Sequence, residues 1–366
     1  MKHKLNLLLL FGGRSGEHAV SLMSAASIKE AIDKEKYVVH QVGITQDGAW
    51  LTGQSTLETF KDGSIAGLSE VVLINEQGKV NLYTRSNNQL RLLTSVDVIF
   101  PVLHGTYGED GTIQGMFEIL DAAYVGAGVL GSSTAMDKSI CKHIIEAEGI
   151  PVLEYATFSR NDVNNQLEKV FEDAEKIAPY PLFIKPANLG SSVGISKAHN
   201  RAELIPALKK AARYDRRILV ERGLNAREIE ISVLGNDQPI HSVPGEIFPD
   251  AEFYTYNDKY FNGVAELCIP ASLSEKQTNL IYDYAIRAFK SLDCAGLARV
   301  DFLMDKDTEE IYFSEINTMP GFTHISMYPK LWNACGLSYS ALVDRLIELA
   351  FERKAERDAT VRKFED

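Results

Sequence analysis

The stretch "GLARVDFLMDKDTEEIYFSEIN", residues 296–317, decides the predicted fold. Two apolar runs flank the turn sequence "DKDT", a pattern that predicts an antiparallel hairpin. Because side chains alternate between the faces of a strand, Arg299 and Asp301 share a face of the first strand. Glu315 and Asn317 share a face of the second, where Phe313 is also expected. The hairpin therefore predicts a polar wall suited to Mg²⁺ and to an anion; the alternative is a solvated face with an incidental ion pair.

A small-residue loop follows another predicted strand in "FIKPANLGSSVGIS", residues 183–196. Lys185 ends the strand, and the glycines and serines after it let backbone N–H groups approach phosphate oxygens. The stretch is not a Walker A sequence, so an ordinary hairpin turn is the alternative. Lys138, in "AMDKS", supplies a second cation that could hold the same polyphosphate.

The first third of the chain alternates strand and helix patterns, with strands expected at 5–11, 37–44 and 96–105. This alternation predicts a parallel sheet covered by helices. Residues 47–95 look polar and irregular. Residues 133–149 are expected to form one helix, with Met136 and Ile140 on a single face. The predicted parts are an N-terminal α/β domain (1–128), a central domain (129–223) and a C-terminal domain (224–366).

Composition excludes several classes of protein. A formal net charge of -12 over 366 residues argues against a nucleic-acid partner. No stretch is apolar enough to span a membrane, and the short N-terminal apolar run fits a buried strand better than a signal peptide. The dispersed cysteines, Cys141, Cys268, Cys294 and Cys335, are expected to be buried, reduced thiols.

Further motifs carry weaker signals. Glu221 and Glu228 flank the turn in "VERGLNAREIE", where a nucleoside could bind, although surface charge is the alternative. Glu17 follows the first strand and could bind an ammonium group or complement a helix N-terminus. The glycine-containing stretch around Glu17, "FGGRSGEHAVS" at residues 11–21, lacks the G-x-G-x-x-G spacing of a dinucleotide site. His104 ends a predicted strand at the sheet edge where ligands bind.

Taken in order, these segments resemble the D-alanine–D-alanine ligase family of the ATP-grasp superfamily. The matching stretches are "LFGGRSGEHAVSL", "FPVLHGTYGEDGTIQG", "MDK", "FIKPANLGSSVGIS", "AREIEISVLG", "FYTYNDKY", "GLARVDFL" and "EINTMPGFTHISMYPKLW". The resemblance implies a three-domain α/β ATP-grasp fold with a parallel-sheet N-terminal domain. It also implies a cytoplasmic, homodimeric enzyme that joins two D-alanine molecules for peptidoglycan synthesis, using ATP and two Mg²⁺ or Mn²⁺ ions.

The resemblance also implies a role for each matching residue. Residues expected at ATP are Lys138, Lys185, Ser192, Glu221, Leu224, Glu228 and Lys259. Expected metal ligands are Asp301, Glu315 and Asn317. Expected D-alanine contacts are Glu17, His104, Arg299, Ser326 and Met327, and the expected catalytic set is Glu17, Ser191, Tyr260, Arg299 and Gly321. Gly223 departs from the pattern, since relatives often carry a larger side chain there.

The aromatic segment "EFYTYNDKYF", residues 252–261, resembles the mobile lid of the family. Lys259 is expected to reach the γ-phosphate, and Tyr260 to hydrogen-bond toward Glu17 and Ser191. Tyr260 is the residue type of dipeptide-forming relatives. The nearest rival interpretation is a D-alanine–D-lactate ligase of the same family. Two more distant rivals are a catalytically silent nucleotide-binding regulator and a dehydrogenase.

Overall fold

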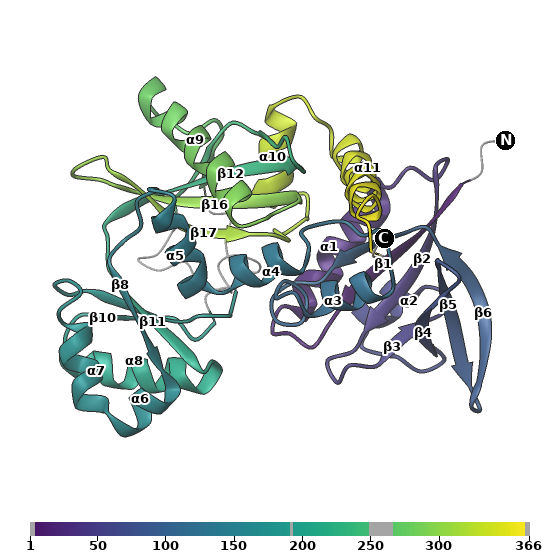
Figure 1. Cartoon of the computed structure of the whole chain (residues 1–366), viewed down its shortest axis with the longest axis horizontal. Helices are drawn as coiled ribbons and strands as arrows, with labels where there is room; N and C mark the ends of the chain where they lie inside the picture. Colours follow the sequence, from purple (N-terminus) through teal and green to yellow (C-terminus); the bar gives the residue numbers. More distant parts are fainter. Residues whose placement is uncertain (1–3, 191–192, 249–265, 363–366) are drawn as a thin grey trace, which may run out of the picture.

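The computed structural model describes residues 4–190, 193–248 and 266–362, which form three β-sheets with helices packed against them (Figure 1). The N-terminal sheet has the order β6-β5-β4-β3-β2-β1-β7. β1 (Leu5–Gly12) pairs in parallel with β2 (Tyr37–Ile44) and β7 (Val98–Val102), as predicted. The other pairs are antiparallel, so the sheet is mixed rather than purely parallel.

Residues 47–95 were wrongly expected to be irregular. They form the strands β3 (Trp50–Thr52), β4 (Ser69–Glu76), β5 (Lys79–Ser86) and β6 (Gln89–Val96), with the short helix α2 (Thr56–Lys61) between β3 and β4. Tight turns join β4 to β5 and β5 to β6, and Gln77, Asn87 and Asn88 have positive φ there. Much of β6 faces solvent, so its side chains give little hydrophobic signal in the sequence.

The single helix expected at 133–149 is also wrong, because the structure has two helices. α4 (Val129–Met136) ends at Asp137, whose carboxylate accepts the backbone N–H groups of Ser139 and Ile140 and so caps α5 (Lys138–Ala147). An aspartate that caps a helix has extended backbone, which breaks the helix before it. Ile140 is consequently 39% exposed instead of sharing a buried face with Met136.

The second sheet has the order β10-β9-β11-β8. Its strands are β8 (Tyr155–Ser159), β9 (Leu182–Pro186), β10 (Ser196–Ala198) and β11 (Arg217–Arg222). The helices α6 (Arg160–Asn165), α7 (Leu167–Ala174) and α8 (Arg201–Tyr214) pack against them around a separate apolar core. This part of the chain lies at one end of the molecule in Figure 1.

The third sheet has the order β15-β14-β12-β16-β17, with β13 paired to β12. Its strands are β12 (Ala226–Gly235), β13 (Ile240–His241), β14 (Gly245–Phe248), β15 (Glu266–Cys268), β16 (Gly296–Asp305) and β17 (Ile311–Asn317). The remaining helices of the described residues are α1 (His18–Ala31), α3 (Thr112–Ile119), α9 (Glu275–Ser291), α10 (Met327–Ala334) and α11 (Tyr339–Asp358).

The predicted hairpin is confirmed as β16 and β17, but one of its side chains was assigned to the wrong face. A bulge lies where Asp301 pairs with Glu315 and the next residue, Phe302, pairs with Phe313. The extra residue in β17 reverses the alternation of faces beyond it. Phe313 is therefore fully buried in the apolar core instead of lying beside Glu315.

One hydrophobic core joins the two ends of the chain. It combines β1 side chains such as Leu9 and Phe11 with Leu342 and Leu346 of α11, and Figure 1 shows α11 against the N-terminal part. Arg357 of α11 also contacts Glu118 at 2.5 Å and Asp121 at 2.9 Å. The domain division at residues 128 and 223 stays a prediction.

The cysteines follow the sequence prediction only in part. All four are free thiols, but Cys335 is exposed and Cys268 is half-buried, whereas Cys141 and Cys294 are buried. Among the described residues, no helix combines the length and apolarity needed to cross a membrane.

Candidate active site

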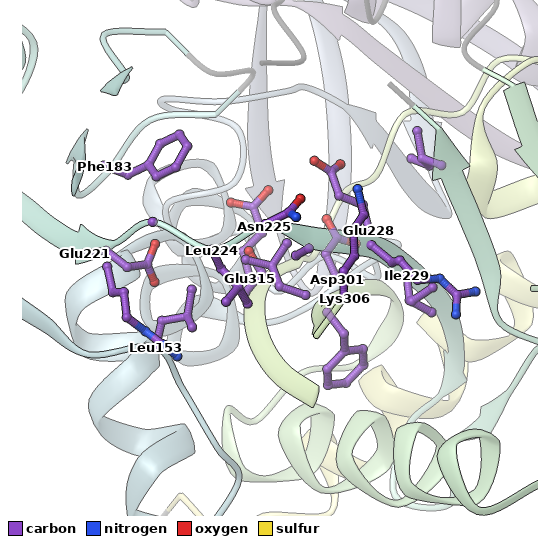
Figure 2. Close-up of a pocket in the computed structure, with 18 of the residues that line it drawn as sticks. Leu153, Phe183, Glu221, Leu224, Asn225, Glu228, Ile229, Asp301, Lys306 and Glu315 are labelled. Carbon is purple, nitrogen blue, oxygen red and sulfur yellow. The ribbon is translucent and has the colours of Figure 1, made fainter. Parts of the chain in front are cut away.

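A cavity of about 1130 Å³ lies between the second and third sheets. Figure 2 shows Glu221 and Phe183 on one side of the view and Asp301, Glu228 and Lys306 toward the other. A second, smaller cavity of about 200 Å³ lies beside it, and Lys138 and Glu315 line both. The two cavities therefore share a charged boundary.

The polar wall of the hairpin forms as predicted. Arg299 pairs across the strands with Asn317, and Asp301 with Glu315. The Arg299 guanidinium donates from Nε to Asp301 Oδ1 at 2.8 Å and from Nη2 to Oδ2 at 2.7 Å. Arg299 Nε also lies 2.9 Å from Glu230 Oε2 on β12. This bidentate geometry fixes the guanidinium plane in a way that a lysine could not.

The Lys185 ammonium is held by a buried carboxylate. Lys185 Nζ donates to Glu221 Oε2 at 2.6 Å, and the other oxygen of Glu221 pairs with Lys142, a fully buried residue of α5. Burial opposes ionisation of Glu221, but the two ammonium groups outweigh it and lower the pKa of its carboxyl to about 2. The same pairing raises the pKa of Lys185 despite its burial, so the site keeps a fixed positive charge.

Lys138 stands where the central loop meets the hairpin. Its Nζ donates to the Leu189 carbonyl at 2.8 Å and lies 3.3 Å from Glu315 Oε2. The preceding Asp137 accepts from Asn188 Nδ2 at 2.8 Å and pairs with Arg217. These contacts attach the start of the glycine-serine loop to the first turn of α5, and they bring Lys138 and Lys185 to the same cavity.

The large cavity also has apolar lining residues. Leu153, Phe183 and Leu224 line it together with Glu228. Gly223 has a steric explanation, because a Cβ at this position would lie 2.6 Å from the Pro181 carbonyl oxygen. The close approach of the two backbones therefore leaves no room for a larger side chain here.

The small cavity collects Gly321, predicted as catalytic, and the predicted substrate-binding residues, Glu17, His104, Arg299, Ser326 and Met327. Glu17 is buried between two loops. A Cβ added to Gly105 would lie 2.5 Å from the Glu17 carboxylate, and a Cβ added to Gly190 would lie 2.8 Å from it. Both ring nitrogens of His104 have partners: Nε2 lies 3.1 Å from Ser24 Oγ, and Nδ1 2.9 Å from the Met319 carbonyl.

Two titratable groups in the small cavity, His104 and Glu109, have pKa values shifted toward their neutral forms. Burial lowers the pKa of His104, although the neighbouring Glu17 opposes this shift. Burial and the Glu17 charge raise the pKa of Glu109 to about 8, and its two backbone N–H donors partly oppose this. The cavity therefore disfavours additional charge unless a ligand brings its own counter-charge.

Family models match almost the whole chain. One, described as "D-ala D-ala ligase N-terminus", matches residues 6–127, and another, "D-ala D-ala ligase C-terminus", matches residues 144–348. The chain belongs to the D-alanine–D-alanine ligase family. The D-alanine–D-alanine ligase of Natranaerobius thermophilus is 48% identical over 364 residues, which cover 99% of each chain.

Two solved structures of ligases have the same fold as this chain. The D-alanine–D-alanine ligase of Coxiella burnetii has a TM-score of 0.82 at 37% identity, covering 97% of this chain and 96% of its own. VanG D-Ala:D-Ser ligase of Enterococcus faecalis has a TM-score of 0.84 at 34% identity, covering 95% and 100%. The chain accordingly has the ATP-grasp fold of these ligases.

Some residues expected in a family site lie outside the described residues. These are Ser191, Ser192, Lys259 and Tyr260, together with the rest of the predicted lid at 252–261. Their roles stay predictions.

The structure also shows charged residues around the two cavities that the sequence reasoning missed. Lys142 follows Lys138 by one helical turn, a spacing that could have revealed it. Glu230 shares a strand face with Glu228, so simple alternation along β12 could also have revealed its position. Glu109 carried no such signal, because its loop geometry depends on the fold.

The hairpin residues fit the divalent metal expected of this ligase family. Asp301 and Glu315 face each other across adjacent strands, and Asn317 Nδ2 donates to Asp301 Oδ2 at 3.0 Å. Carboxylate and amide oxygens are hard donors of the kind that Mg²⁺ prefers. Lys138 and Arg299 balance the two carboxylates in the structure, and the set borders the cavity where phosphates could complete the coordination.

Proposed function

We propose that this protein joins two D-alanine molecules to D-alanyl-D-alanine with hydrolysis of ATP to ADP and phosphate, for peptidoglycan synthesis. One observation carries the proposal. Four elements, α5, β9, β16 and β17, bring together Lys138, Lys185, Arg299, Asp301 and Glu315 around two adjoining cavities, one large enough for a nucleotide and one for small polar substrates. Together with family membership, this arrangement supports phosphoryl transfer to a carboxylate followed by attack of an amine.

We assign the large cavity to ATP. Lys138 and Lys185 would bind its phosphates, with Ser192 and the glycine-serine loop over them and Lys259 reaching the γ-phosphate. The turn from Glu221 through Leu224 would bind adenine, and Glu228 the ribose hydroxyls. Because Glu221 already holds two lysines, its carboxylate also serves to fix Lys185 at the phosphates.

Asp301, Glu315 and Asn317 would hold two Mg²⁺ or Mn²⁺ ions. When bound, these ions supply positive charge that neutralises the phosphate oxygens and orients them for in-line transfer. The contribution of the chain is the β16–β17 register, which sets the three donors along one edge of the cavity.

The small cavity would bind both amino acids. Glu17 would accept the ammonium of the first D-alanine, and Arg299 would bind its carboxylate while His104 lies nearby. Ser326 and the Met327 N–H, at the start of α10, would bind the carboxylate of the second. Ser326 Oγ already lies 2.8 Å from Thr323 Oγ1, so its position is fixed.

The chemistry follows from the leaving group. A carboxylate resists attack by an amine because oxide would have to leave, whereas an acyl phosphate releases phosphate. A carboxylate oxygen of the first D-alanine attacks the γ-phosphorus, and ADP leaves. The neutral amine of the second then attacks the acyl carbon; Arg299 and the Gly321 N–H would stabilise the oxyanion. Phosphate departs, and closure of the lid, with Tyr260 linking to Glu17 and Ser191, would exclude water.

Phosphate release measured with purified protein, ATP, Mg²⁺ and D-alanine tests the proposal. We expect release that depends on D-alanine, with D-alanyl-D-alanine as the product by mass spectrometry. Parallel reactions that add D-lactate or D-serine to D-alanine distinguish ester and mixed dipeptide formation. Absence of D-alanine-dependent phosphate release would refute the proposed activity. The homodimer and the cytoplasmic location stay predictions, and sedimentation equilibrium tests the first.

A further inference from the structure

The loop after β17 is held by side chains from the opposite end of the sequence. Residues 318–326 connect the hairpin to α10, and they include Gly321, the proposed oxyanion donor. Met319 and Phe322 are buried in the core that is shared with β1 and α11. The backbone groups on either side of Gly321 are bound by Ser24, His104 and Glu109.

The hydrogen bonds form one consistent chain of donors. The Phe322 N–H donates to Ser24 Oγ at 3.3 Å, and Ser24 Oγ lies 3.1 Å from His104 Nε2. His104 Nδ1 lies 2.9 Å from the Met319 carbonyl, which can only accept. The neutral ring must therefore carry its proton on Nδ1, and Nε2 must accept the Ser24 hydroxyl proton.

Glu109 completes the attachment. Its Oε1 accepts the Met319 N–H at 3.2 Å, while Oε2 accepts the Gly105 N–H at 2.6 Å. The same peptide segment is thus bound through both its N–H and its C=O, and the Glu109 side chain also links it to the loop that carries His104. Such contacts matter because an oxyanion donor displaced by about 1 Å costs on the order of 10²-fold in rate.

We propose that Ser24, His104 and Glu109 are positioning residues that set the Gly321 N–H for the tetrahedral intermediate. In this assignment His104 acts through the Met319–Phe322 backbone rather than by binding substrate. The inference rests on the proposed function only where it gives these contacts a purpose in catalysis. The clamp itself, defined as these three side chains and the 319–322 backbone, stands on the contacts above.

Kinetics of Ser24→Ala and of two histidine variants test the role. Asparagine can place its amide N–H near the position of Nδ1, whereas glutamine places it near Nε2. We expect His104→Asn to keep more of kcat than His104→Gln, because it retains the donor to Met319. Ser24→Ala should lower kcat about tenfold with KM for ATP unchanged. Ser27→Ala, on the same helix but with its hydroxyl donating to the Met23 carbonyl within it, should change kcat less than twofold.

A substrate-binding role predicts a different result. His104→Asn would then raise KM for D-alanine at the first site without lowering kcat, and Ser24→Ala would match Ser27→Ala. Either outcome would overturn the positioning role. Thermal unfolding of each variant shows whether a loss of kcat comes from loss of the folded state instead.

The clamp has a readout that needs no turnover. ¹⁵N chemical shifts of the imidazole nitrogens in histidine-labelled wild-type protein report the tautomer of each ring. We expect one ring with Nδ1 protonated and Nε2 unprotonated, and its assignment follows from its loss in His104→Asn. An Nε2–H tautomer or an imidazolium at pH 7 would overturn the clamp. Absence of dipeptide synthesis by the wild type, with this tautomer present, would instead overturn the proposed function.

Discussion

Lys185 Nζ lies 2.6 Å from Glu221 Oε2, and this single contact links the stability of the central sheet to the charge of the proposed phosphate site. Glu221 also pairs with the buried Lys142, so one carboxylate is shared by two ammonium groups inside the protein, and a net positive charge remains. Breaking a buried pair leaves an uncompensated charge, which is costly.

We therefore expect Glu221→Gln to lower the free energy of unfolding by about 3–5 kcal/mol, because two buried lysines would lose their counter-charge. Thermal unfolding at pH 7 measures the effect. Glu172→Gln, on the exposed face of α7, is the matched control and should change little. Equal unfolding temperatures for Glu221→Gln and wild type would contradict the role of the pair.

The same carboxylate predicts how stability depends on pH. The pKa of Glu221 is about 2 in the folded protein, below its ordinary value of 4.5. Its ionised form therefore stabilises the protein above about pH 4.5, and this contribution, about 3 kcal/mol, is lost as the pH falls toward 2. The stability gap between wild type and Glu221→Gln should narrow over this range, and a gap that stays constant from pH 5 to pH 3 would contradict it.

Lys185→Ala should lower phosphate release with ATP and D-alanine at least about 10²-fold, because a fixed phosphate counter-charge is lost. Lys176→Ala, in the same part of the chain but in an exposed pair with Asp173, is the control. Near-normal turnover of Lys185→Ala would refute the assignment of this lysine to the phosphates.

Asp137→Ala should weaken ATP binding as well as stability. It removes the cap of α5 and releases Asn188 at the base of the glycine-serine loop. The cap alone is worth about 1 kcal/mol. Ser159→Ala removes the corresponding cap of α6, so it should cost similar stability while leaving KM for ATP unchanged. Identical KM values for the two variants would show that Asp137 only stabilises its helix.

Arg299→Lys should lower kcat strongly, by about 10²-fold, although it keeps the charge. The guanidinium makes two parallel bonds to Asp301 and also contacts Glu230, a geometry that an ammonium group cannot reproduce. Arg345→Lys, in an exposed pair on α11, serves as control. An unchanged kcat in the Arg299→Lys variant would mean that charge alone suffices here.

Tyr260→Phe should admit some D-lactate as second substrate, since it removes the lid hydroxyl that the family resemblance associates with dipeptide formation. Reactions with mixed D-alanine and D-lactate, analysed for ester and dipeptide, measure the change. A variant that makes only dipeptide would contradict this account of Tyr260.

The sequence by itself determined several of the local elements and which residue types surround the chemistry. Alternation along 296–317 predicted the wall of Arg299, Asp301, Glu315 and Asn317, because strand periodicity is a local property. The small residues after Lys185 and the turn at Glu221 were likewise readable from short stretches.

Tertiary structure decided what depends on contacts between distant segments. The bulge that buries Phe313 shifts the strand pattern by one residue, and the cap at Asp137 ends one helix and begins the next. Periodicity alone did not reveal either. The pairing of Lys142 with Glu221, and the hold of His104 on Met319, join residues 79 and 215 positions apart. Such buried polar contacts form only when the packed core excludes water from both partners, and the folded arrangement alone determines this.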